Sequence, residues 1–183
     1  DPVSTSGNFA LSGGSADATA FTKGPLNAGS YSFKAHYNGD SNYNAADGAC
    51  EPLTVTKVTP NINTIPNPTT GYVGYTLNDS ASLTGGYTPG GSIVFKLFSP
   101  SDSTCSGTAT YTDTVSVSGN GDYATSPGFS ANTSGTWHWT AIYGGDSNNN
   151  SVSSACADEA VTVAKVDPST TTDIHSADHQ TLT

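Results

Sequence analysis

Two short runs of the sequence have the alternating oxygen side chains from which calcium loops are built. Each reads D-x-N-x-N, and residues two apart in a turn can direct their oxygens at one ion. Neither run has the glycine that the sixth position of an EF-hand loop requires. The interpretation we favour is a polar hairpin turn whose Asp and Asn side chains bind their own backbone. The candidate calcium ligands are Asp40, Asn42 and Asn44 in the first run, and Asp146, Asn148 and Asn150 in the second.

Other groups that could do chemistry are less well arranged. His175 and His179 lie four apart beside Asp173, but that spacing converges on zinc only in a helix, and we expect strand or linker here. No nucleophile motif surrounds any serine, so we predict a protein that is not an enzyme and that needs no cofactor, apart from calcium in the alternative above. Three N-x-S/T sequences could carry a glycan, at Asn78, Asn132 and Asn149.

The D-x-N-x-N runs belong to a longer segment that occurs twice. Residues 29–50 read GSYSFKAHYNGDSNYNAADGAC and residues 135–156 read GTWHWTAIYGGDSNNNSVSSAC, so equivalent positions lie 106 residues apart. Residues 51–60 match residues 159–168 at an offset of 108. A unit of roughly 110 residues is the size of one small sandwich domain. We therefore divide the chain into the C-terminal half of one unit (1–56), a complete unit (57–164), and a linker with the start of a further unit (165–183).

This division predicts that the two parts differ in stability. The complete unit can bury its own core, whereas residues 1–56 present only the back strands of a unit. We expect the front strands to come from a longer polypeptide or from another copy of the chain, with residues 166–183 as the donated segment.

The repeat also indicates how the three cysteines pair. Cys156 is the counterpart of Cys50, and Cys105 lies in the front half of the complete unit. The simplest pairing is Cys105 with Cys156, and Cys50 with a partner outside this chain. Two cysteines per unit, without a catalytic motif, are typical of an extracellular disulfide framework.

Charge and composition exclude several kinds of partner. The sequence has no arginine, five lysines and fifteen acidic residues, which gives a net charge of −10. Such a chain cannot neutralise phosphates, so we expect no nucleic acid and no binding to anionic membrane surfaces. No apolar run approaches 18 residues, so we expect no insertion of this segment into a membrane. An acidic chain rich in Ser, Thr, Asn and Gly is typical of secreted and cell-surface proteins, and we predict an extracellular location.

The elements that position these groups should all be strands. No apolar run holds the 3.6-residue period of a helix, whereas β-branched and aromatic runs bounded by Gly, Pro and Ser recur every 8–12 residues. This pattern predicts an all-β, antiparallel sandwich. The expected strands are Gly91–Phe98, Thr110–Val117, Gly135–Tyr143 and Ala160–Val166, with shorter ones near Asn61–Ile65, Tyr72–Leu77 and Ala81–Thr84.

Comparison of the two copies indicates which strand face is core. One face stays aromatic and small, while the opposite face varies among polar types. We therefore expect the constant face to be buried, because aromatic side chains dominate sandwich cores. It contains Trp137, Trp139 and Ala141 in the second copy, and Tyr31, Phe33 and Ala35 in the first.

One motif resembles a known family. The pattern G-T-W-x-W-x-A-x-Y-G-G-D-S-N-N-N, followed by VTVAKV at Val161–Val166 and a proline, resembles the bacterial Ig-like domain repeats of large surface proteins and adhesins. The first copy carries the same pattern in Gly29–Asp40 and Leu53–Lys57. The resemblance implies tandem Ig-like antiparallel β-sandwich repeats. Its members are most often stalks and spacers, and sometimes ligand-binding modules.

The junctions between units favour a structural role. Lys57–Pro60 (KVTP) and Lys165–Pro168 (KVDP) follow the last strand of each copy, and proline stiffens such a junction. Adjacent repeats, or copies of the chain, should then contact one another head to tail. We predict a non-enzymatic structural repeat of an extracellular bacterial stalk, adhesin shaft or filament, stapled by disulfides. The alternative is an Ig-like module that binds carbohydrate or a host protein through its loops.

Overall fold

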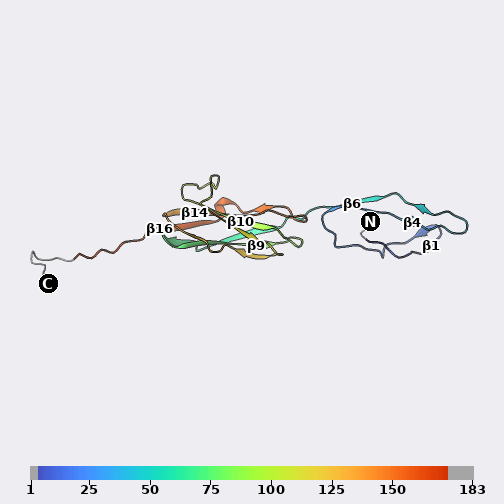
Figure 1. Ribbon diagram of the computed structural model, residues 1–183, viewed down its shortest axis with the longest axis horizontal. Coiled ribbons are helices and arrows are strands. Elements are labelled where there is room, and N and C mark those ends of the chain that lie inside the picture. Colours follow the sequence, from blue (N-terminus) through green and yellow to red (C-terminus); the bar gives the residue numbers. More distant parts are fainter. Residues whose placement is uncertain (1–3, 173–183) are drawn as a thin grey trace, which may run out of the picture.

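The computed structural model describes residues 4–172 and arranges them as an elongated series of β-strands (Figure 1). Residues 4–56 lie at one end, a two-sheet sandwich occupies the middle, and the chain leaves the sandwich at the far end after its last strand. The protein is thus all-β with several sheets, as the sequence predicts.

The larger sheet of the sandwich has the strand order β11-β10-β14-β16-β8, and β15 pairs with the end of β14. Its neighbours are antiparallel except for β8, which runs parallel to β16. Its strands are β8 (Thr70–Tyr72), β10 (Ser92–Phe98), β11 (Tyr111–Ser116), β14 (Gly135–Tyr143), β15 (Val152–Ser153) and β16 (Ala160–Ala164).

The smaller sheet has the order β12-β9-β13, and β7 also pairs with β9. The path of the chain between the two sheets accounts for the parallel pair of β8 and β16, which departs from the antiparallel sandwich expected from the sequence. The chain passes from β7 in this sheet directly into β8 in the other, so β8 enters beside β16 without reversing direction. The strands of this sheet are β7 (Asn61–Asn67), β9 (Thr76–Thr84), β12 (Gly121–Ala124) and β13 (Phe129–Ser130).

One predicted strand is wrong. The expected strand Tyr72–Leu77 combines the end of β8, a tight turn closed by the Tyr75 amide on the Tyr72 carbonyl oxygen at 3.0 Å, and the start of β9. The short strands β12, β13 and β15 were not predicted, because two to four residues are too few to show a period.

The hydrophobic core lies between the two sheets of the sandwich. Along β14, Trp137, Trp139, Ala141 and Tyr143 are buried, whereas the alternating residues are partly exposed. The predicted core face is therefore confirmed in this copy. Each large apolar side chain buried in this way stabilises the fold by about 1.5–3 kcal/mol.

Residues 4–56 form three pairs of strands that lie in no two-sheet sandwich. No residue from 4 to 59 is buried. Phe33 and Leu53 are 43% and 37% exposed, while their counterparts Trp139 and Val161 are 0% exposed, because no second sheet among the described residues covers the first copy. The pairs are β1 (Leu11–Ser12) with β2 (Ser15–Ala16), β3 (Gly29–Phe33) with β6 (Glu51–Val55), and β4 (His36–Tyr37) with β5 (Ala46–Asp47).

The strand pairing of this first segment nevertheless matches that of the sandwich. Tyr31 lies opposite Leu53 in β3–β6, as Trp137 lies opposite Val161 in β14–β16. The pairing of β4 with β5 likewise has the register of β14 with β15. The duplicated sequence therefore produces a duplicated strand register.

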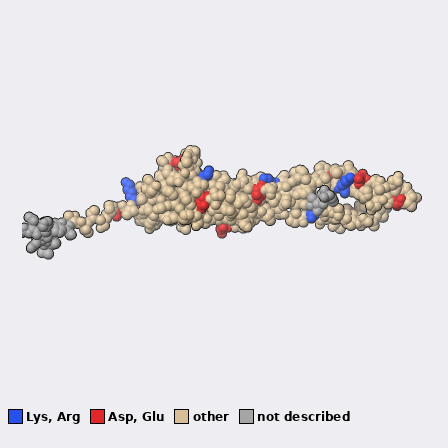
Figure 2. Space-filling view, viewed as in Figure 1, with Lys and Arg blue, Asp and Glu red and all other residues tan. Residues whose placement is uncertain are grey.

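The surface carries few charges. Figure 2 shows Lys, Asp and Glu side chains scattered singly or in small groups over the visible face, separated by wide uncharged areas. Uncharged polar groups therefore supply much of the contact chemistry available on this face.

Candidate functional site: the Asp146 loop

The tight turn between β14 and β15, residues 144–150, is here called the Asp146 loop. The loop turns at Gly145, whose φ of +77° suits glycine, and a Cβ there would lie 2.8 Å from the Asn149 carbonyl oxygen. Asp146 Oδ1 accepts hydrogen bonds from the backbone amides of Asn148 at 2.7 Å and Asn149 at 2.8 Å. The aspartate therefore organises its own turn.

The other carboxylate oxygen of Asp146 ties the loop to the sandwich. Asp146 Oδ2 accepts hydrogen bonds from the Gly90 amide at 2.7 Å and the Tyr143 hydroxyl at 3.0 Å. Burial opposes ionisation of Asp146, but the hydrogen bonds from Gly90, Asn148, Asn149 and Tyr143 outweigh it and lower its pKa. Burial and the bond to Asp146 raise the pKa of Tyr143 to about 12. A charged acceptor thus holds a neutral tyrosine in place.

Asn149 anchors the loop from the inside. Its side chain is 0% exposed, its Oδ1 accepts from the Tyr87 amide at 2.8 Å, and its Nδ2 donates to the Tyr87 carbonyl oxygen at 3.0 Å. A buried amide with both ends bonded is satisfied and fixes one loop conformation. Asn149 is thus structural, although its N-x-S sequence had made it a glycan candidate. Of the other two such asparagines, Asn132 is exposed and Asn78 is half-buried.

Asn148 reaches across to the first segment. Its Oδ1 accepts from the Ala28 amide at 2.9 Å, and its Nδ2 donates to Asn27 Oδ1 at 3.3 Å. Asn27 and Ala28 directly precede β3. One side chain therefore joins the sandwich to the neighbouring strand pair.

The junction between the two segments also pairs with the Asp146 loop. The Val58 amide donates to the Asn148 carbonyl oxygen at 2.9 Å, and the Asn150 amide donates to the Val58 carbonyl oxygen at 2.8 Å. Val58 thereby forms an isolated parallel bridge with Asn149. Lys57 Nζ donates to the Asp146 carbonyl oxygen at 2.5 Å, and Asn150 Nδ2 donates to Thr59 Oγ1 at 2.9 Å. We call these contacts, together with those of Asn148, the joint.

The first copy contains the same turn, residues 38–44, here called the Asp40 loop. Asp40 Oδ1 accepts from the amides of Asn42 at 2.7 Å and Tyr43 at 2.9 Å, and the Tyr37 hydroxyl donates to Asp40 Oδ2 at 2.8 Å. Hydrogen bonds from Asn42 and Tyr37 lower the pKa of Asp40. Gly39 has φ +80°, close to that of Gly145. The whole loop from residue 38 to 44 faces solvent, apart from partly exposed Gly39.

These contacts bear on the calcium interpretation, which stays a prediction. Asp146 and Asp40 already accept backbone amide hydrogens, as expected of the polar turn. The Asn148 and Asn150 side chains are bonded within the joint, and those of Asn42 and Asn44 lie in the exposed first loop. Within residues 4–172, no group of three or more His, Cys, Asp or Glu side chains is placed to hold a metal ion. His175, His179 and Asp173 lie outside the described residues.

The predicted disulfide is present. Cys105 and Cys156 are bonded, with their Cα atoms 5.9 Å apart and a sequence separation of 51. The bond joins the long loop after β10 to a short 3₁₀ helix, Cys156–Asp158, that directly precedes β16. Cys50 is a free, exposed thiol in this chain.

Sequence reasoning missed a buried pair of acidic side chains. Asp79 and Glu159 are each 1% exposed, and Asp79 Oδ2 and both oxygens of Glu159 have no hydrogen-bond donor among the described residues. Burial, together with the negative charge of Glu159, raises the pKa of Asp79 to about 8. The signal in the sequence is that Glu159 recurs as Glu51 at the head of the last strand of the first copy.

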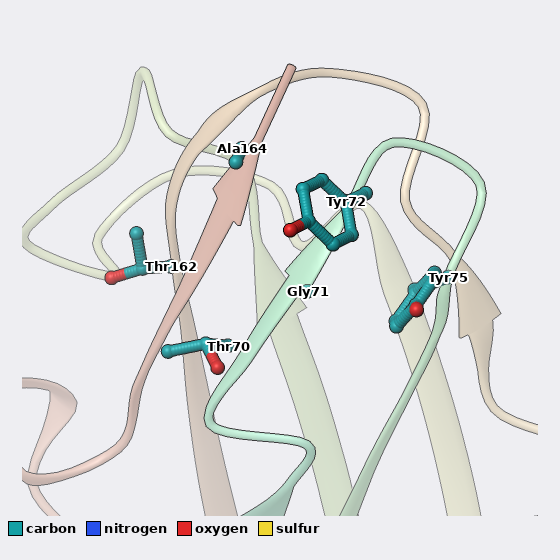
Figure 3. A pocket seen from close by; sticks show the side chains of 6 residues that line it. All are labelled: Thr70, Gly71, Tyr72, Tyr75, Thr162 and Ala164. Atoms are coloured by element: carbon teal, nitrogen blue, oxygen red, sulfur yellow. The ribbon is translucent and has the colours of Figure 1, made fainter. Parts of the chain in front are cut away.

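The opposite end of the sandwich is hollowed. Tyr72 and Tyr75 are each 51% exposed and meet edge to face with ring centroids 5.7 Å apart. Figure 3 shows their rings beside the hollow, with Thr70 and Gly71 on β8 and Thr162 and Ala164 on β16. We call this the Tyr72–Tyr75 hollow.

Comparisons with known proteins add no relative. No protein-family model matches the chain, and no curated protein is significantly similar to it in sequence. None of the helices among the described residues has the length and apolar character needed to cross a membrane.

Proposed function

We propose that this chain is a non-enzymatic structural segment of an extracellular bacterial stalk, adhesin shaft or filament, built from tandem Ig-like repeats. The joint carries this proposal. Asn148 and Val58 connect the end of the sandwich to the strand pair before it, through side-chain and backbone hydrogen bonds rather than through a loose linker. A load-bearing shaft needs such fixed contacts between successive units.

Three further features support this function. The strand register of β3–β6 recurs in β14–β16, as expected of repeated units. The Cys105–Cys156 bond suits an oxidising environment outside the cell. The scarcity of charge leaves a surface of hydroxyl and amide groups, which suits a hydrated shaft.

Single-molecule pulling tests the load-bearing role. The disulfide hides the 51-residue stretch between Cys105 and Cys156 from extension, so reduction should add about 180 Å to the length gained when the sandwich unfolds. Equal extension with and without reductant would show that the bond bears no load. If the sandwich extended without a distinct unfolding event, as an unstructured chain does, the result would argue against a shaft.

The Tyr72–Tyr75 hollow favours a second candidate function, a module that binds carbohydrate or a host protein. Exposed tyrosine rings can stack on a sugar ring or fill a protein interface. Titration with a glycan panel, followed by tyrosine fluorescence and by loss of the signal in Tyr72→Ala, tests this candidate. A panel without any saturable binding would count against carbohydrate recognition.

A further inference from the structure

The joint has an unused counterpart at the far end of the sandwich. Asn27 and Ala28, which receive the Asn148 side chain, precede β3. Thr133 and Ser134 hold the same place before β14, 106 residues later. Thr133 is exposed and Ser134 partly exposed, so their polar groups lie at the surface.

The strand side of the joint recurs there as well. Lys57 and Val58 follow β6 and bind the Asp146 loop, and Lys165 and Val166 follow β16 in the same sequence. Val166 is 60% exposed. An exposed Lys-Val pair therefore follows β16, as it follows β6.

The Tyr72–Tyr75 hollow lies on this same end. Gly135, the residue after Ser134, pairs with Val163, and the neighbouring residues Thr162 and Ala164 line the hollow. Figure 3 shows Thr162 and Ala164, the neighbours of Val163 on β16, beside the two tyrosine rings of the hollow. We call Thr133, Ser134, Lys165, Val166 and the hollow the end face.

The chain also carries a second loop of the kind that fills the joint. The Asp40 loop has the internal hydrogen bonds of the Asp146 loop, and Asn42 stands where Asn148 stands. The chain between β4 and β5, which contains the Asp40 loop, lies at the end of the first segment away from the sandwich (Figure 1), and Asn42 is exposed. The Asp40 loop and the end face therefore lie at opposite ends of the described part of the chain.

We propose that the end face is a docking site for the Asp40 loop of a second copy of this chain. Asn42 bonds the Ser134 amide and the Thr133 side chain, as Asn148 bonds Ala28 and Asn27. Val166 pairs with the backbone of residues 42–44, and the Lys165 ammonium group lies at the Asp40 carbonyl oxygen. The tyrosines of the hollow supply the apolar area that the polar contacts lack. This inference rests on the proposed function, because it extends the joint from within one chain to between chains.

Directed cross-linking tests the docking. In a Cys50→Ser background, chains carrying Asn42→Cys are mixed with chains carrying Ser134→Cys and oxidised gently, and mixed dimers are measured by mass under non-reducing conditions. We expect this pair to form at least tenfold faster than Asn42→Cys with Thr114→Cys, since Thr114 is exposed in the middle of β11, away from both ends. Equal rates for the two pairs would overturn the proposal.

A second variant checks that the loop itself is recognised. Asp40→Ala removes the carboxylate that shapes the Asp40 loop without touching the sandwich, and it should abolish the excess cross-linking of Asn42→Cys. An excess that survives Asp40→Ala would also overturn the proposal.

The intrachain pair Ala28→Cys with Asn148→Cys separates this inference from the proposed function. A bridge within the chain, without the bridge between chains, would leave the shaft standing and reject docking through the end face. Loss of both bridges would count against the joint on which the proposed function rests.

Discussion

The backbone amide of Ala28 donates a hydrogen bond to Oδ1 of Asn148 at 2.9 Å, although 120 positions separate the two residues in sequence. Because Nδ2 of the same side chain also donates to Asn27 Oδ1, both polar atoms of the Asn148 amide group are bonded to the residues that precede β3. Asn148 therefore helps to orient the first segment on the sandwich, together with the backbone pairing of Val58 and the Lys57 and Asn150 side-chain contacts of the joint.

Removing that side chain should loosen the joint without weakening the sandwich. In Asn148→Ala, spin labels placed in β3 and β10 should show a broader distance distribution by pulsed electron spin resonance. The unfolding midpoint of the sandwich should change little, because the lost bonds lie outside its core. Asn149→Ala is the matched control, and should instead destabilise the sandwich, since Asn149 is buried and bonded to Tyr87. An unchanged distribution in Asn148→Ala would contradict this role.

Replacing Asp146 should destabilise the sandwich more than replacing Asn148. Asp146→Ala leaves the Gly90, Asn148 and Asn149 amides without their acceptor, so we expect a loss of about 1–3 kcal/mol in the free energy of unfolding. Urea titration followed by tryptophan fluorescence measures it. Asp40→Ala, in the exposed first loop, should leave the sandwich transition unmoved.

Because of Asp146, the stability of the folded protein should also be sensitive to acid. The pKa of Asp146 is lowered in the folded protein from its ordinary value of 3.8, so its stabilising contribution is complete above that value and declines as the pH falls below it. The loss of stability of the native chain between pH 5 and pH 2 should therefore exceed that of Asp146→Asn. Parallel curves for the two proteins over this range would reject the assignment.

The buried acidic pair predicts the opposite pH dependence. The pKa of Asp79 is raised from 3.8 to about 8, so the folded protein keeps a proton that the unfolded chain releases. Stability should fall as the pH rises from about 4 to about 8. Asp79→Asn should flatten this decline and stabilise the sandwich by a few kcal/mol at pH 8.5, because each pKa unit corresponds to about 1.4 kcal/mol. Asp167→Asn, an exposed substitution, should retain the dependence of stability on pH seen in the native chain. The same dependence in Asp79→Asn would contradict the raised pKa of Asp79.

The disulfide should contribute a large part of the stability of the sandwich. Closing a loop of 51 residues is worth about 4 kcal/mol by the chain-entropy relation. Replacing Cys105 and Cys156 by serine should lower the free energy of unfolding by an amount of this order, as measured by denaturant titration. Cys50→Ser is the control, and an equal effect of both changes would show that the bond is not what stabilises the fold.

Local pattern predicted much of the sandwich. The alternation of Trp137, Trp139 and Ala141 with polar residues fixed the buried face of β14, and the glycine before Asp146 marked the turn. The same face in the first copy is exposed, since Phe33 has no second sheet over it among the described residues. Alternation shows which face of a strand is apolar, but it does not supply the layer that buries that face.

The candidate site was only half predicted. The D-x-N-x-N spacing identified Asp146, Asn148 and Asn150, because side-chain bonding within a turn depends on near neighbours in sequence. It gave no sign that Asn148 would bind Ala28. Glutamate is rarely fully buried, so residue type gives no sign that Glu159 lies buried beside Asp79.

Sequence alone therefore determined the longer strands of the sandwich, the turn of the Asp146 loop, the Cys105–Cys156 pairing and the repeated register, all of which follow from periodicity and from comparison of one copy with the other. Tertiary structure alone decided the parallel pairing of β8 with β16, the burial of Asp79 against Glu159 and the contact of Asn148 with Ala28. Residues far apart in sequence meet only where the folded layers bring them together. The physical reason is that backbone geometry and turn chemistry act over a few residues, whereas sheet order and burial are set by how the whole chain excludes water.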